Sequence, residues 1–129
     1  MDWRQFNFIK KSAASDRVFI GGAGTVLFFE DQSVVKQYQE KFSSYADKFP
    51  SWSDHTSGMH QYVVWTALAS LNIGANLKHY NPVIDEDVTN TWNVDSNWRL
   101  VAQIMFGGIE NTAGDKSFEP IEKRLKVFG

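Results

Sequence analysis

Hydrophobic positions along the chain fall into runs that predict a small β-sheet. Thr25-Val26-Leu27-Phe28-Phe29 is a continuous β-prone run that follows a glycine-rich stretch and ends at an acidic pair. A run without polar alternation is typical of a strand that is buried on both faces. Residues 98–106 form a second strong run that two glycines end, and residues 75–80 alternate as a short strand.

Helical spacing dominates the stretches between these runs. Asp31 is placed to cap a helix in which Val34, Val35, Tyr38 and Phe42 recur, and Pro50 is expected to close it. The longest periodic segment opens at Ser53 or Asp54 and continues nearly to Gly74, a natural C-terminal stop. Apolar and small residues lie most of the way round this helix, which predicts a central position in the fold.

The remaining segments complete one domain. Residues 1–20 are mixed and are read as a helix, residues 84–92 as a short acidic helix, and residues 110–119 as a polar loop. The chain ends in a tail, residues 121–128, in which hydrophobic and basic positions alternate. This order of elements predicts a single α+β or α/β domain over residues 1–129, with a small sheet against a central helix.

Composition narrows the classes of function. The 129 residues suffice for one domain with a core, and a formal charge of −2 argues against sequence-independent binding to nucleic acid or anionic lipid. The absence of cysteine excludes disulfides, iron–sulfur clusters and thiol chemistry. No run of 18 apolar residues predicts a membrane span, and the start lacks the apolar run of a secretory signal. A cytoplasmic location is therefore expected.

Motifs for hydrolysis, metal binding and phosphate binding are missing or misplaced. The chain has no G-x-S-x-G motif, and the histidines at 55, 60 and 79 do not have zinc-binding spacing, so solvated or capping roles are favoured. The acidic run at 85–87 suits the first turn of a helix better than a cation site. The glycines at 21–24 precede a strand, whereas a phosphate loop follows one. These patterns alone indicate an α+β domain and do not decide whether it is a monomer or an oligomer.

Three longer stretches resemble a known family. They are GTVLFFED at residues 24–31, SGMHQYVVWTALA at residues 57–69 and NIGANLKHYNPVID at residues 72–85. Each is similar to the corresponding segment of the FMN-dependent nitroreductases, in the branch shared by bacteria and fungi. The likeness continues in register through Trp92-Asn93, Trp98-Arg99-Leu100, Gln103, Phe106-Gly107 and residues 118–128, so that it covers residues 21–129 after a divergent start at 1–20.

The resemblance implies an α+β nitroreductase-like fold and an FMN-binding homodimer. In such proteins NADH or NADPH passes a hydride to the flavin, which then reduces a nitroaromatic or a quinone in a second half-reaction. The protein holds the ring, sets its potential and leaves one ring face open to alternating substrates, so no side-chain acid or base is expected to be catalytic.

The resemblance also implies positions for the cofactor. The segment Asn72-Ile73-Gly74 corresponds to one that passes near the flavin ring, where Gly74 allows close approach and backbone N–H groups are available. Arg124 and Lys126 correspond to basic residues near the FMN phosphate. Two plain structural roles stay open at this point, a helix C-cap for Gly74 and an exposed basic edge for the tail.

The family's beginning is not recognised in this sequence. Members open with a helix carrying an Arg-Arg-Ser/Thr motif and continue with a Pro-Ser-x-Asn-x-Gln loop, whereas Arg4 stands alone here. Three interpretations follow: a short flavoprotein that rebuilds its site as a dimer, a non-catalytic nitroreductase-like domain acting as a partner or structural subunit, or a truncated inactive product. The first is favoured because the matching stretches resemble those of an oxidoreductase family.

Overall fold

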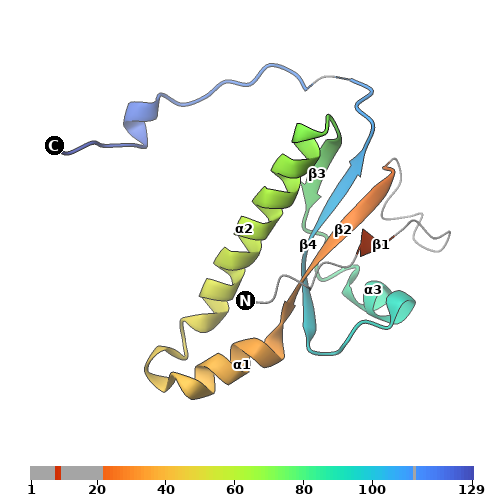
Figure 1. Ribbon diagram of the computed structural model, residues 1–129, viewed down its shortest axis with the longest axis vertical. Coiled ribbons are helices and arrows are strands. Elements are labelled where there is room, and N and C mark those ends of the chain that lie inside the picture. Colours follow the sequence, from red (N-terminus) through yellow and green to blue (C-terminus); the bar gives the residue numbers. More distant parts are fainter. Residues whose placement is uncertain (1–7, 10–21, 112) are drawn as a thin grey trace.

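The computed structural model describes residues 8–9, 22–111 and 113–129. Its elements, in chain order, are β1 (Phe8–Ile9), β2 (Gly24–Asp31), α1 (Gln32–Lys41), the 3-10 helix η3 (Ser43–Tyr45), α2 (Phe49–Ser70), β3 (Gly74–Lys78), α3 (Asp85–Trp92), β4 (Trp98–Gly107) and the 3-10 helix η4 (Ile121–Lys123). Figure 1 shows α2 running along a twisted sheet and α1 meeting it at a wide angle, with the C-terminal segment beyond the end of β4.

The four strands form one antiparallel sheet in the order β1-β2-β4-β3. The two strongest hydrophobic runs of the sequence, β2 and β4, pair at its centre, from Gly24 opposite Phe106 to Asp31 opposite Trp98. A register shift between Phe28 and Phe29 interrupts this ladder. Central strands of a sheet bury the most surface and so consist of long apolar runs. For this reason both strands could be predicted from the sequence.

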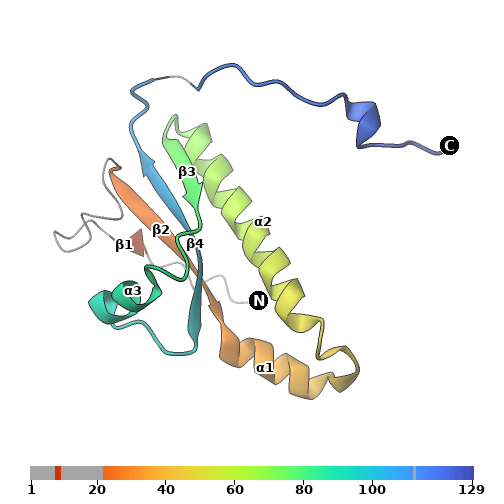
Figure 2. The same cartoon turned by 180° about the vertical axis from the view of Figure 1, so that it is seen from behind.

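Both faces of the sheet are covered, as the unbroken run at 25–29 predicts. On one face Val26, Phe28, Ala102 and Ile104 are buried beneath α2. On the other face Leu27 and Leu100 pack with Ile84, which precedes α3, and with Val88 of α3; Figure 2 shows this helix from behind. A small sheet with helices on its two faces confirms the α+β fold.

Asp31 caps α1 as predicted. Its carboxylate accepts the backbone N–H of Ser33 at 2.8 Å and the Ser33 hydroxyl at 2.6 Å. Chiefly the Ser33 hydroxyl bond, and also backbone bonds from Ser33 and Val34, hold the pKa of this carboxyl below its ordinary value. The cap fixes the point at which β2 turns into α1.

The boundaries of the long helix differ from the sequence prediction. Pro50 does not close α1: it lies in the first turn of α2, which begins at Phe49 and not at Ser53 or Asp54. Backbone N–H groups in the first turn of a helix have no intrahelical acceptor. Proline, which lacks this N–H, therefore loses no hydrogen bond at that position. The helix also ends earlier than Gly74, at Ser70, and Gly74 instead begins β3.

The prediction of a helix over residues 1–20 is wrong at Phe8–Ile9, which form β1 against Val26 and Thr25. The rest of that range, 1–7 and 10–20, lies outside the described residues. The other predicted elements stand: the short strand is Gly74–Lys78, the acidic helix is Asp85–Trp92 and the second strong strand is Trp98–Gly107. Among the described residues, no helix is both long and apolar enough to cross a bilayer.

Candidate functional site

The turn at residues 72–74 connects the C-terminal end of α2 with the first residue of β3. Asn72 has a left-handed backbone (φ 55°), and the N–H groups of Asn72 and Ile73 donate to carbonyl oxygens of Ala69 and Leu68 at 3.0 Å each. These two amides are therefore committed to closing the helix. The exposed Asn72 side chain and the backbone of Gly74 are the groups that this turn can present to a ligand.

Gly74 is constrained by a close approach of the backbone. A Cβ atom at this position would lie 3.2 Å from a side-chain carbon of Ile109 and 3.4 Å from the carbonyl oxygen of Gly107. Gly74 pairs with Gly107, and the absence of a side chain on Gly74 lets the ends of β3 and β4 meet. The helix C-cap suggested for Gly74 is not what the structure shows, since the helix ends four residues earlier.

Arg124 and Lys126 lie in the C-terminal segment, directly after η4. Both residues are exposed, and the Arg124 guanidinium donates to the carbonyl oxygen of Glu119 at 3.3 Å within the same segment. Figure 1 shows this segment running past the C-terminal end of α2 and away from the sheet. Within one chain, then, the described structure does not bring the basic pair together with residues 72–74.

A groove of about 500 Å³ lies at the opposite end of α2, between β2, α1 and the first three turns of α2. Its walls carry the aromatic side chains of Tyr38, Phe49 and Trp52, and its polar lining includes Glu30, Asp31 and His60. The Phe49 ring lies 5.7 Å from Tyr38 and 5.3 Å from Trp52, centroid to centroid, and meets Trp52 edge to face. This geometry is a favourable one for aromatic pairs.

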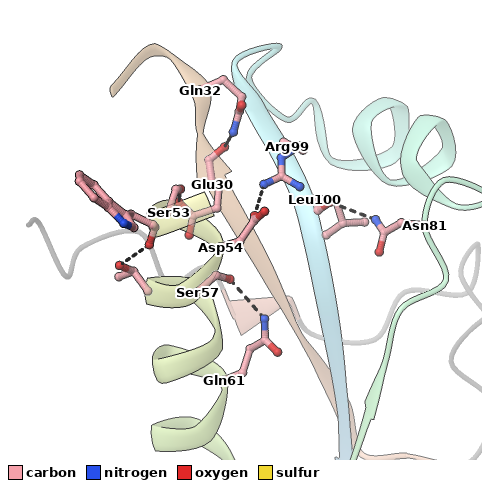
Figure 3. A network of polar contacts seen from close by, with 11 residues as sticks. Glu30, Gln32, Ser53, Asp54, Ser57, Gln61, Asn81, Arg99 and Leu100 are labelled. Carbon is pink, nitrogen blue, oxygen red and sulfur yellow. Dashed lines mark hydrogen bonds and ion pairs between the residues drawn. The ribbon is translucent and has the colours of Figure 1, made fainter. Parts of the chain in front are cut away.

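Polar contacts fix the wall of this groove where α2 crosses the sheet. The Ser53 hydroxyl donates to the Glu30 carboxylate, and Arg99 of β4 pairs with Asp54 at 2.5 Å, as Figure 3 shows. One turn further along α2, the buried Gln61 amide donates to the buried Ser57 hydroxyl at 3.2 Å. Because these partners come from β2, β4 and α2, they set the angle between the helix and the sheet.

The face of α2 that points away from the sheet is apolar and exposed. Ser57 and Gln61 are buried, and Val64 and Leu68 pack on the core cluster, so these four mark the sheet side of the helix. Met59, Tyr62 and Val63, which lie on the other side by helical spacing, are 61%, 70% and 61% exposed. We call these three residues the outer stripe of α2. Within this chain, the apolar character all round the helix is matched by burial on one side only.

Comparison with known proteins identifies the family of this chain. A sequence model of the Nitroreductase family matches residues 3–108. The chain belongs to the nitroreductase family. Nitroreductase CinD from Lactococcus lactis, in a structure with nicotinic acid, is 40% identical and superimposes with a TM-score of 0.88 over 97% of this chain and 76% of that one. The resemblance seen in the sequence and the expected nitroreductase-like fold are thus confirmed.

Two curated nitroreductase relatives come from Saccharomyces cerevisiae. HBN1 is 33% identical over 92% of this chain, and the nitroreductase FRM2 is 36% identical over 74% of it. The matches span 58% of HBN1 and 48% of FRM2, so this chain covers about half the length of the curated relatives.

Sequence reasoning missed the groove at the start of α2. Its lining is drawn from three elements between residues 27 and 60, and no local motif connects them. One signal was available, because Tyr38, Phe42, Phe49 and Trp52 place several large rings within 15 residues of one another. Such a density of rings beside a helix boundary indicates an aromatic cluster, although not the shape that it takes.

Proposed function

We propose that this nitroreductase-family chain is an FMN-dependent oxidoreductase. It would bind FMN as a homodimer and act in the cytoplasm. It would take electrons from NADH or NADPH and deliver them to a nitroaromatic or a quinone. When bound, FMN supplies the hydride acceptor and donor. The residues proposed to hold it are Asn72, Ile73 and Gly74 at the ring, and Arg124 and Lys126 at the phosphate.

The observation that carries this proposal is the likeness to the Lactococcus protein over nearly the whole chain. Structures of that protein contain nicotinic acid, 4-nitrophenol and chloramphenicol. Nicotinic acid has the pyridine ring of a nicotinamide nucleotide, and the other two compounds are nitroaromatics. One protein that binds both chemical classes suits a reaction in which a reductant and an acceptor use the same site in turn.

The chain's own residues fit FMN as two separate half-sites. Arg124 offers a planar fork and Lys126 a point charge, and both suit a phosphate dianion. The turn at 72–74 offers the exposed Asn72 side-chain amide beside the backbone of Gly74. Because the C-terminal segment leads away from this turn in Figure 1, the proposal requires either that it folds back or that a second copy supplies it.

The exposed outer stripe of α2 supports the homodimer. An apolar helix face of this kind is typical of an interface between subunits. Two copies related by a twofold axis would each present the same stripe, as a self-complementary interface demands. A dimer would also bring the C-terminal segment of one chain within reach of a second chain.

A visible absorption spectrum tests this function. The purified chain is incubated with FMN and desalted, and we expect a retained flavin band that NADH or NADPH bleaches under anaerobic conditions. Addition of 4-nitrophenol or a simple quinone should restore the band. A folded chain that retains no flavin, judged by circular dichroism and the spectrum together, would refute the catalytic proposal.

One observation favours a second candidate, a non-catalytic nitroreductase-like subunit. The outer stripe of α2 is apolar and exposed in the described structure. A different member of the family could cover it in place of a second copy of this chain. Co-purification with a full-length family member, in place of flavin retention, would select this candidate. A chain that shows neither would correspond to the third interpretation, a truncated inactive product.

A further inference from the structure

We propose that the groove between β2, α1 and α2 is a second ligand site, selective for a planar aromatic ring that carries an ammonium group. The groove lies at the N-terminal end of α2, whereas the turn proposed to approach FMN follows its C-terminal end. The two sites therefore differ in place and in residues.

The size of the groove suits a small organic molecule. Its volume of about 500 Å³ falls within the range of about 300–1,000 Å³ that is usual for ligand pockets. Hydrophobic residues of β2 and α1 form its floor, and Phe28 and Val35 among them are buried. An aromatic ring that entered the groove would contact an apolar surface that is already formed, and it would displace few polar contacts.

The aromatic walls favour a flat ring and a positive charge. Tyr38 and Trp52 line the groove and are 47% and 46% exposed, so each has a ring surface left to cover. Phe49 holds the two rings by packing against both. Tryptophan and tyrosine faces attract cations through their quadrupoles, and they stack on other rings at offset or edge geometries.

The charges of the lining select the sign of the ligand. Among the described residues that line the groove there are two carboxylates, Glu30 and Asp31, and one histidine, His60, but neither lysine nor arginine. Asp31 is committed to the N-cap of α1, where two bonds from Ser33 reach one of its oxygens. Glu30 accepts the hydroxyl of Ser53. A carboxylate offers about four acceptor positions, so Glu30 retains capacity for an ammonium donor.

These features together describe an amine recognised by one charge-assisted hydrogen bond and by ring stacking. The ammonium group would donate to Glu30 while the attached ring lies against Trp52 and Tyr38. Anionic aromatics of the same shape would meet two carboxylates in a partly enclosed groove and would be rejected.

A matched pair of probes tests the proposal. Tryptamine and indole-3-propionate share an indole ring and a two-carbon arm and differ in the sign of the terminal charge. The ¹⁵N-labelled full chain is titrated with each probe at pH 8, with the Trp52 indole N–H, assigned through Trp52→Phe, as the reporter. We expect tryptamine to bind at least about 10-fold more tightly than indole-3-propionate, and to shift the Trp52 signal.

Glu30→Gln isolates the charge. Glutamine keeps an oxygen that can accept the Ser53 hydroxyl, so the contact between β2 and α2 is retained. Tryptamine affinity should fall about 10-fold, while affinity for the anion stays the same or rises. Glu86→Gln is the matched control, because it removes the same charge from an exposed position on α3, on the other face of the sheet. Should Glu30→Gln fail to fold, Asp31→Asn removes a charge and keeps a capping residue.

Three results would overturn the proposal. The first is equal affinity for the two probes, and the second is an equal effect of Glu30→Gln and Glu86→Gln. The third is a Trp52 signal that moves with protein concentration and not with tryptamine, which would assign the groove to contact with a second copy. Flavin retention is measured separately, so failure of this site leaves the proposed function standing.

Discussion

The side chain of Gln103 holds the backbone of Tyr80 across the sheet edge: its Oε1 accepts the Tyr80 N–H at 2.9 Å. Its Nε2 donates to the Asn81 side chain at 3.1 Å, and the Asn81 amide donates in turn to the carbonyl oxygen of Leu100 at 3.1 Å. Gln103 is fully buried in β4. A polar side chain in this position is stable because the segment after β3 satisfies both ends of its amide.

Gln103→Leu should therefore destabilise the fold. The substitution keeps most of the side-chain volume but leaves the Tyr80 N–H and one Asn81 oxygen without their partner. Loss of a buried hydrogen-bond partner costs about 1–3 kcal/mol, and urea denaturation of the variant should show a decrease of that size. Gln37→Leu, at an exposed position of α1, is the control for loss of a glutamine. An unchanged midpoint for Gln103→Leu would mean that residues 79–81 do not depend on this amide.

The stability contributed by Asp31 should depend on pH. Its folded-state pKa lies below the ordinary value of 3.8, chiefly because of the Ser33 hydroxyl. A carboxyl whose pKa is lowered by folding stabilises the fold above its unfolded pKa, and this contribution is lost as pH falls through the folded pKa. Asp31→Ala should cost about 0.5–2 kcal/mol at pH 6, the usual cost of losing an N-cap.

Measurement of unfolding free energies from pH 6 to pH 2.5 checks this prediction. The difference between wild type and Asp31→Ala should be constant down to about pH 4 and should shrink below about 3.8. Asp31→Asn is the control, since asparagine caps helices without titrating. A difference that grows on acidification would contradict the assignment of the carboxylate as the cap.

The sequence predicts the sheet better than it predicts the helices. β2 and β4 are contiguous apolar runs, and their burial on both faces follows from local composition alone. The ends of α2 were missed because local signals there oppose one another. Pro50 usually breaks a helix but is accepted in the first turn, and the left-handed Asn72 ends the helix before Gly74 is reached.

The candidate site was predictable only in pieces. The turn at 72–74 and the basic pair at 124 and 126 each lie in a short segment with a recognisable resemblance. Their relation in space depends on where the C-terminal segment lies, and local sequence does not determine that. The groove depends on the angle between α2 and the sheet, which is set by contacts such as Ser53 with Glu30, 23 residues apart.

Arg124→Ala tests the phosphate half of the proposed flavin site. If the guanidinium contacts the phosphate, loss of this charge-assisted bond should weaken FMN binding by about 1–3 kcal/mol, or about 5- to 150-fold in Kd. Fluorescence quenching of FMN on titration with protein gives the affinity. Lys123→Ala is the matched control from the same segment, because Lys123 is exposed and pairs with Glu119 at 2.6 Å. Equal affinities for Arg124→Ala and wild type would remove Arg124 from the site.

The proposed homodimer leads to the last prediction, which concerns the outer stripe of α2. Tyr62 is 70% exposed in the chain and follows Met59 by three residues on the outer stripe, so a twofold axis near it would bury the two copies of this residue together. Tyr62→Glu would place two carboxylates in an apolar interface, and burial of unpaired charge should convert the dimer to a monomer at micromolar concentration.

Sedimentation velocity checks this against Asn90→Glu, which adds the same charge at an exposed position of α3. A wild-type chain that sediments as a monomer would remove the dimer, whereas a Tyr62→Glu dimer would move the interface elsewhere. Because the two proposed half-sites for FMN lie apart in one chain, loss of the proposed dimer by Tyr62→Glu should also reduce flavin retention if the second copy supplies the basic segment. Unchanged retention in a monomeric variant would show that the chain's own tail folds back.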